Sequence, residues 1–187
     1  MRIISGSLKG KKINFLKSSI TRPLKDSVKE NIFNIISHSN MFDLDLQRSN
    51  ILDLYSGVGS FGLECISRGA NKVVFVEKDI NASKVISQNL LTLNIMNKAI
   101  IVKEEITNFL NKKNLGKFNI IFLDPPYIST DYLNDLILIR QKKIYQKQHI
   151  VIIHRDCKSS DVYEKTLETI LIRKYGRSKI IFGKFLR

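Results

Sequence analysis

The sequence predicts an α/β fold with a mostly parallel, seven-stranded sheet. From about residue 50 onward, apolar runs of strand length alternate with stretches of helical periodicity. These runs are almost continuously apolar, which is typical of parallel strands that are buried on both faces. The last two runs are separated by a short segment rich in turn residues, which indicates an antiparallel hairpin at the C-terminal end.

The first 45 residues do not follow this repeat and are expected to form a small hairpin-helix extension. Apolar segments at 3–6 and 12–15 flank a turn at Gly10, which predicts the hairpin. A helix is expected just after Pro23, from an apolar stripe formed by Val28, Ile32, Phe33, Ile35 and Ile36. The extension is too small for a core of its own, so we divide the chain into an extension, 1–45, and a main domain, 46–187.

The main domain alternates strands and helices in chain order. Strands are expected at 51–55, 73–76, 100–102, 120–123 and 150–153, and helices at 60–68, 80–93, 105–112 and 132–139. The final strands, 169–172 and 180–182, flank the turn 175–178. We expect the extension to lie on the substrate side of the carboxyl edge of this sheet, and deletion of residues 1–20 to leave the main domain folded.

Size and composition exclude several classes of protein. A chain of 187 residues that is 43% hydrophobic can bury a core, which excludes a disordered or fibrous protein. No apolar run approaches the roughly 18 to 20 residues of a membrane helix, and residues 1–6 lack the pattern of a signal peptide, so we expect a cytoplasmic protein. Cys65 and Cys157 are too few and too far apart for a disulfide framework or a zinc site, and we expect reduced thiols.

The positive charge is concentrated at the two ends of the chain. The net charge is +14, with 8 basic and 2 acidic residues in 1–30, 10 and 11 in 31–139, and 13 and 4 in 140–187. A general excess of lysine would not leave the middle neutral. The asymmetry favours a polyanionic partner, a nucleic acid, that both ends contact.

A glycine-containing loop follows the first strand of the main domain. The segment Asp53-Leu54-Tyr55-Ser56-Gly57-Val58-Gly59-Ser60 opens a helix, and its glycines allow a ligand to approach the backbone closely. Glu77, at the end of the next strand, can accept hydrogen bonds from both hydroxyls of a ribose. Asp53 would repel a pyrophosphate and attract an ammonium group. The combination favours S-adenosylmethionine, and NAD stays open as an alternative on these residues alone.

The segment Asp124-Pro125-Pro126-Tyr127 closes the fourth strand and should lie beside the glycine loop. The two prolines remove N–H donors, so the Asp124 carboxylate and the Pro125 carbonyl remain as acceptors next to a tyrosine ring. Acceptors beside an aromatic ring suit a planar base with an exocyclic amino group.

These residues resemble a known family. Asp124 to Tyr127 is similar to the catalytic tetrapeptide of amino-directed S-adenosylmethionine methyltransferases, and the segments 1–10 and 21–34 resemble the RsmD-type 16S rRNA guanine-N(2)-methyltransferases. The resemblance implies a Rossmann-like class I methyltransferase fold and methyl transfer to N(2) of a guanine, with S-adenosylhomocysteine as product. It also implies 16S rRNA as partner, within a small-subunit particle. We expect a monomer and no metal.

The resemblance also assigns roles to residues. It places Asp53, Gly57 and Gly59 in the loop on the methionine side, Glu77 at the ribose, Glu105 near the adenine, and Asp124, Pro125, Pro126 and Tyr127 in the base pocket. Tyr55, Ser56 and Lys78 are further cofactor-binding candidates. The RNA-binding candidates are basic residues of the extension: Lys9, Lys11, Lys12, Arg22 and Lys25.

The chain departs from the family pattern at Leu24-Lys25, at Ser27 and at His154-Arg155. A glutamate is common at the position of His154-Arg155, and we leave His154 and Arg155 outside the predicted site.

Three alternatives to this function stay open. A DNA or RNA adenine or cytosine amino-methyltransferase shares the tetrapeptide. A pyrimidine carbon-5 methyltransferase would use Cys157 as nucleophile, but Tyr127 replaces its expected arginine. A non-catalytic RNA-binding assembly factor is disfavoured because the site residues are all present.

Overall fold

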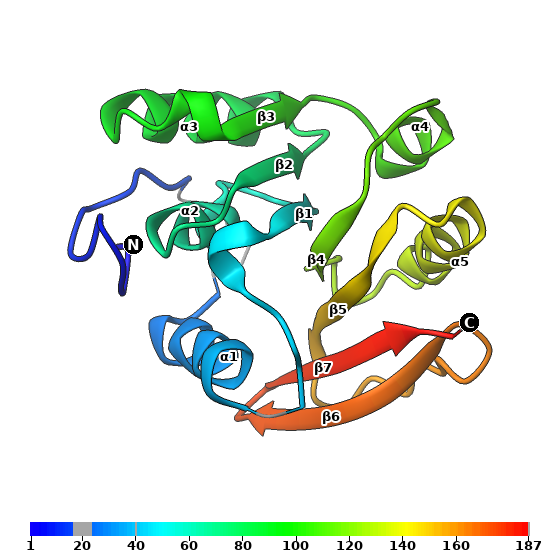
Figure 1. Ribbon diagram of the computed structural model, residues 1–187. Coiled ribbons are helices and arrows are strands. Elements are labelled where there is room, and N and C mark those ends of the chain that lie inside the picture. Colours follow the sequence, from blue (N-terminus) through cyan, green and yellow to red (C-terminus); the bar gives the residue numbers. More distant parts are fainter. Residues whose placement is uncertain (17–23, 40, 187) are drawn as a thin grey trace.

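The computed structural model describes residues 1–16, 24–39 and 41–186 and contains one seven-stranded sheet in the order β3-β2-β1-β4-β5-β7-β6 (Figure 1). The strands are β1 (Asn50–Leu54), β2 (Lys72–Val76), β3 (Ala99–Val102), β4 (Phe118–Leu123), β5 (Tyr145–Asp156), β6 (Leu167–Tyr175) and β7 (Ser178–Phe185). Strands β1 to β5 are parallel, and β7 is antiparallel to both β5 and β6. The predicted fold class is therefore confirmed.

Helices cover both faces of the sheet. They are α1 (Asp26–His38), α2 (Ser60–Ser67), α3 (Ile80–Thr92), α4 (Ile106–Asn111) and α5 (Tyr132–Lys142), with short 3-10 turns η1 (Leu46–Arg48) and η2 (Met96–Lys98). Successive strand residues point to opposite faces. Ile51 accordingly packs in the core under α1, α2 and α3, whereas Leu52 packs in the core under α4 and α5 (Figure 1). In the described parts of the chain, no helix is long and apolar enough to cross a membrane.

The C-terminal hairpin forms as expected. Tyr175 pairs with Ser178 across a two-residue turn, in which Gly176 adopts a φ of 59°. Because Ser178 also pairs with Asp156, the last residue of β5, this turn lies at the carboxyl edge of the sheet. The carboxyl edge is where ligands bind in open α/β sheets.

The N-terminal hairpin is reduced to a single bridge between Arg2 and Lys12. Its tip packs on the end of α2, because the Ser7 amide donates to the Ser67 carbonyl at 2.7 Å and the Leu8 amide to the Ser67 hydroxyl at 3.0 Å. Helix α2 starts at the carboxyl edge and ends at the amino edge. The expectation that the whole extension lies at the carboxyl edge is therefore wrong for the hairpin tip, which in Figure 1 lies beside α2 and α3, away from the arrowheads of β1 to β3.

The start of α1 does lie toward the carboxyl edge. The fully buried Lys29 donates from Nζ to the hydroxyl of Ser60, at the start of α2, and to the carbonyl of Arg2. Its Nζ also lies 3.6 Å from the buried Glu64 carboxylate, which accepts hydrogen bonds from the amides of Ile4 and Ser5. Burial lowers the pKa of Lys29, and the nearby Glu64 opposes that shift. The extension therefore shares one core with the sheet. The division of the chain at residue 45 stays a prediction. Pro23, which was expected to precede the helix, lies outside the described residues.

Candidate active site

The loop between β1 and α2 is shaped by backbone conformations that glycine favours. Gly57 and Gly59 have φ values of 55° and 81°, and Tyr55 has a positive φ of 57°. The Ser56 hydroxyl donates to the Asp53 carbonyl at 2.6 Å, with the Val76 carbonyl at 3.1 Å, so it ties the loop to β2. None of the described residues would lie within 4 Å of a Cβ atom on Gly57, so they leave space beside the loop there.

Asp53 lies beneath this loop and is only 1% exposed. Its Oδ2 accepts a hydrogen bond from the Gly62 amide at 3.0 Å, whereas its Oδ1 has no partner among the described residues. Burial raises the pKa of Asp53 well above its usual range, and the charges of Asp124 and Glu77 raise it further. Three of the four carboxylates predicted for the site, those of Asp53, Glu77 and Asp124, thus gather at one edge of the sheet, where a cationic group would relieve their repulsion.

Gly62 is a residue that the sequence reasoning missed. A Cβ atom there would lie 2.3 Å from the Phe75 ring, so the absence of a side chain lets α2 approach β2 closely. This close packing brings the Gly62 amide within reach of Asp53. The only sequence signal was a third glycine shortly after the loop.

Glu77 follows β2 and faces the glycine loop. Its Oε2 accepts from the Gly57 amide and its Oε1 from the Asp79 amide, both at 2.8 Å. Burial raises the pKa of Glu77, and these amide hydrogen bonds oppose the shift. A carboxylate has lone pairs left after two such bonds, so Glu77 can still accept from hydroxyl groups.

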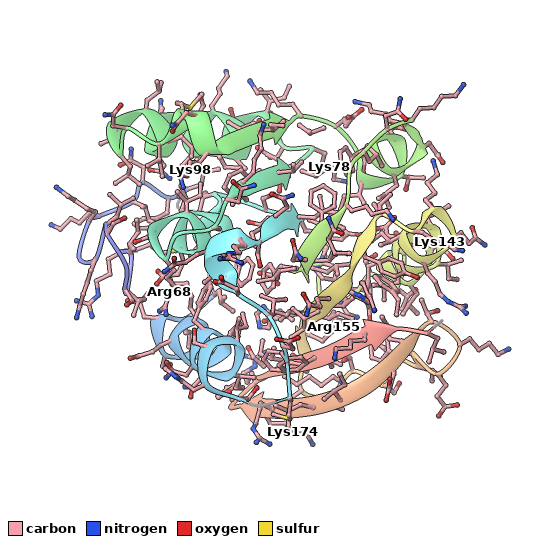
Figure 2. All side chains as sticks on the ribbon, viewed as in Figure 1. Arg68, Lys78, Lys98, Lys143, Arg155 and Lys174 are labelled. Atoms are coloured by element: carbon pink, nitrogen blue, oxygen red, sulfur yellow. The ribbon has the colours of Figure 1, made fainter. Side chains whose placement is uncertain are left out.

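Lys78 and Glu105 form an exposed ion pair at 3.1 Å. Lys78 follows the end of β2 (Figure 2), and Glu105 follows the end of β3. Tyr55 instead turns toward α5 and donates from its hydroxyl to Asp135 at 2.7 Å. Burial raises the pKa of both Tyr55 and Asp135. The backbone of Tyr55 thus belongs to the loop, whereas its hydroxyl braces the loop against α5.

The tetrapeptide lies next to the glycine loop, as its sequence position predicts. The Asp124 amide hydrogen-bonds to the Leu54 carbonyl at 3.4 Å, directly before the loop begins. Its side chain is 26% exposed and its Oδ1 lies 2.8 Å from Nδ1 of His154. Pro125 is buried and Pro126 is exposed. The four residues are held between the ends of β1 and β5.

His154 and Arg155, which were left outside the predicted site, both contact this tetrapeptide. His154 lies between Asp124 and the Tyr127 hydroxyl, and Arg155 donates to the carbonyls of Pro126 and Tyr127 at 3.0 and 3.1 Å. Arg155 is buried, its guanidinium lies over the Tyr132 ring of α5, and it pairs with Asp161 at 3.0 Å (Figure 2). The sequence signal for both residues was their position directly after the predicted strand 150–153, which is part of β5 and lies beside β4.

The basic residues of the two ends lie in different places. Lys9 and Lys11 are exposed near the hairpin tip, at the amino edge. Lys12 lies nearer to α1, where its backbone forms the β-bridge with Arg2. Lys25 is exposed at the start of α1, toward the carboxyl edge, and Arg22 lies outside the described residues. Exposed basic residues also flank the β6–β7 turn: Lys158, Arg173, Lys174 and Arg177.

Comparisons with known proteins agree with one another. Residues 1–184 match the family model described as "Conserved hypothetical protein 95". The chain is 32% identical to the Bacillus subtilis protein named "Putative rRNA methyltransferase YlbH", with 98% of each protein covered. It is 31% identical to "Ribosomal RNA small subunit methyltransferase D" of Buchnera aphidicola, over 87% of this chain and 82% of that protein.

Solved structures show the same fold. The structure named "Putative methyltransferase yhhF from Escherichia coli" superposes with a TM-score of 0.83 at 24% identity, covering 99% of this chain and 97% of that one.

Proposed function

The chain belongs to the RsmD-type methyltransferase family, and from this premise we propose that it transfers a methyl group from S-adenosylmethionine to the exocyclic N(2) amine of a guanine in 16S ribosomal RNA. The observation that carries the proposal is the meeting of the Asp124 tetrapeptide with the glycine loop at the carboxyl edge of the sheet. The small-subunit particle is the proposed form of the substrate, and the protein acts as a monomer.

The residues at the edge of the sheet fit S-adenosylmethionine. The unpartnered Oδ1 of the buried Asp53 and its raised pKa both favour a positive charge nearby, which the cofactor carries. The described residues leave space beside Gly57, and Glu77 offers acceptors for ribose hydroxyls. Glu105, paired with Lys78, lies where β3 ends and is proposed to border the adenine. When bound, the cofactor supplies an electrophilic methyl group.

The base pocket acts on the amine that receives the methyl group. The lone pair of a guanine amino group is delocalised into the ring, which makes the amine a poor nucleophile. Hydrogen bonds from the amine to the Asp124 carboxylate and the Pro125 carbonyl would localise that lone pair. Among the described residues, no group donates a hydrogen bond to the Pro125 carbonyl, whereas Arg155 donates to the carbonyls of Pro126 and Tyr127.

Tyr127 is proposed to stack on the base and hold it in line with the methyl group. Most of the rate gain then comes from alignment and from electrostatics, with Asp124 as a hydrogen-bond acceptor. Asp124 also lies where it can take the extra proton of the amine after transfer.

Both basic ends of the chain are proposed to contact RNA phosphates. The β6–β7 turn places Arg173, Lys174 and Arg177 at the same edge as the tetrapeptide. Lys25 and Arg22 are the proposed contacts from the extension at this edge, and Lys9, Lys11 and Lys12 would contact more distant phosphates. A folded RNA or a ribosomal particle is large enough to reach both.

Incubation with methyl-labelled cofactor tests the proposal directly. The substrates are naked 16S rRNA and unmethylated small-subunit particles, and the methylated nucleoside is identified by mass spectrometry. N(2)-methylguanosine is the expected product. A methylated adenosine or cytidine would contradict the choice of base, and no transfer to either substrate would favour a non-catalytic role.

A further inference from the structure

We propose that His154 is a positioning residue for methyl transfer, which fixes one carboxylate oxygen of Asp124 and the hydroxyl of Tyr127 at the same time. This role rests on the proposed function. His154 is only 3% exposed, so it does not meet the substrate directly. It acts through the two side chains of the motif that do.

The imidazole uses both of its nitrogens on the motif. Nδ1 lies 2.8 Å from Oδ1 of Asp124, and Nε2 lies 3.3 Å from the Tyr127 hydroxyl. The tyrosine and histidine rings meet edge to face, with centroids 5.6 Å apart and an interplanar angle of 85°. Leu123 pairs with Ile153 across β4 and β5, so the sheet register itself places Asp124 beside His154.

Only one neutral tautomer satisfies both contacts. An ionised Asp124 can only accept, so Nδ1 must carry the hydrogen. Nε2 is then an acceptor, and the Tyr127 hydroxyl donates to it. This arrangement fixes the direction of both hydrogen bonds and therefore the orientation of both side chains.

The two carboxylate oxygens of Asp124 therefore have different roles. Oδ1 is held by His154, while Oδ2 has no hydrogen-bond partner among the described residues. A carboxylate that is fixed through one oxygen presents the other to the base in a defined direction. Misplacing such an acceptor by about 1 Å can cost about 100-fold in rate.

Arg155 holds the same motif by its backbone. Neighbouring strand residues point to opposite faces, so His154 and Arg155 reach the motif from two sides. Arg155 fixes the carbonyls of Pro126 and Tyr127, and Asp161 in turn fixes the guanidinium. The backbone thus stays in place when His154 is changed, which isolates the effect of the imidazole.

Two substitutions separate the two nitrogens. His154→Asn places an amide nitrogen near the position of Nδ1 and keeps the contact with Asp124. His154→Gln places its amide near the position of Nε2 and loses the contact with Asp124. We expect kcat to fall by about threefold in His154→Asn and by about 10- to 100-fold in His154→Gln. The KM for rRNA, the Kd for S-adenosylmethionine and the unfolding temperature should match those of the wild type.

A double-mutant cycle tests the other contact. Tyr127→Phe removes the hydroxyl that donates to Nε2, so it should lower kcat in the wild-type background and have no further effect in His154→Asn. Equal losses of kcat in His154→Asn and His154→Gln, or additive effects of Tyr127→Phe, would overturn the proposal.

A measurement without turnover covers the case in which a variant does not fold. The chain has three histidines, and 15N chemical shifts of the imidazoles in the wild-type protein identify their tautomers. Hydrogen on Nδ1 of His154 supports the arrangement, and hydrogen on Nε2 alone overturns it. If the wild-type protein methylated no RNA, the proposed function would fail, while this spectrum would still decide how His154 is bonded.

Discussion

At the scale of single residues, Glu77 is expected to serve the cofactor and not the RNA. We predict that Glu77→Ala weakens binding of S-adenosylmethionine by roughly 1.5 to 3 kcal/mol, because hydrogen bonds to a charged group are lost. RNA affinity should stay unchanged. Calorimetry with cofactor and filter binding with RNA measure the two effects, and unchanged cofactor affinity in a folded variant would remove Glu77 from the site.

The raised pKa of Glu77 gives this residue a second, pH-dependent signature. Burial disfavours the ionised form in the ligand-free protein, so the stability associated with Glu77 is fully present below its unfolded pKa and is lost as pH rises through its folded pKa. Glu77→Gln should remove that loss. We therefore predict that the ligand-free variant unfolds at the same or a higher temperature than the wild type at neutral pH, although it binds cofactor less tightly. An unfolding temperature below that of the wild type would show that the ionised carboxylate of Glu77 stabilises the glycine loop.

Asp124 and Tyr127 are expected to act on the base. Asp124→Ala and Tyr127→Ala should bind cofactor within a few fold of wild type and lose turnover. Tyr127→Phe should keep activity within about threefold, because its ring still stacks and only a neutral hydrogen bond to His154 is lost. If the Phe variant were as inactive as the Ala variant, the hydroxyl and not the ring would be essential.

At the scale of elements, the loop that carries the tetrapeptide is fastened to the end of β5 by hydrogen bonds from Arg155, and a buried ion pair with Asp161 holds this arginine in place. Burial would raise the pKa of Asp161, but its hydrogen bonds to Arg155 outweigh this and lower it. A lowered pKa contributes stability that is present above the unfolded pKa and is lost as pH falls through the folded pKa. We predict that the wild type loses stability in acid more steeply than Asp161→Asn does, which denaturant melts at a series of pH values would measure. Parallel curves would contradict the assignment.

The order of elements was predictable because apolar periodicity is a local property of the chain. Strands and helices of the main domain were expected within a few residues of where they lie, and the glycine loop, Glu77 and the tetrapeptide were found from their positions at strand ends. Contacts between distant segments were not predictable in this way. His154 acquires its role only because β5 lies beside β4, and the hairpin tip meets Ser67 only because α2 runs back toward the amino edge.

At the scale of the whole molecule, the placement of charge allows the two basic ends to be tested separately. We predict that neutralising Lys9, Lys11, Lys12, Arg22 and Lys25, or Arg173, Lys174 and Arg177, weakens RNA binding. The log-log salt slope should fall by roughly 0.7 to 0.9 for each lost phosphate contact. Cofactor binding should survive in both variants.

The matched control removes three exposed lysines in the segments that lead into the amino ends of β4 and β5, away from the tetrapeptide: Lys113, Lys117 and Lys143. A salt titration of RNA affinity compares the three variants with the wild type. Equal slopes in the control and an end variant would show that the charges of that end are solvated and make no contact with RNA.

The extension cannot be removed as cleanly as its size suggested. Ile3 and Ile13 belong to the main core, and the fully buried Glu64 depends on the amides of Ile4 and Ser5. Leaving a buried hydrogen-bonding group without its partner typically costs about 1 to 3 kcal/mol. These contacts argue against the expectation that deletion of residues 1–20 leaves the main domain intact. Such a deletion should lower the unfolding temperature, which calorimetry would measure.

These same contacts set an order of events during synthesis of the chain. The amide of Ile4 bonds to a carboxylate 60 residues later, and that of Asn14 bonds to Asn89, 75 residues later. Residues 1–14 leave the ribosome before α2 and α3 and can dock only after these two helices have emerged and folded, because the helices supply the surface that they join. Until then, Ile3 and Ile13 lack the core that buries them in the folded protein. A protein proposed to modify ribosomal RNA would complete its own N-terminal fold only when about half of the chain has been made.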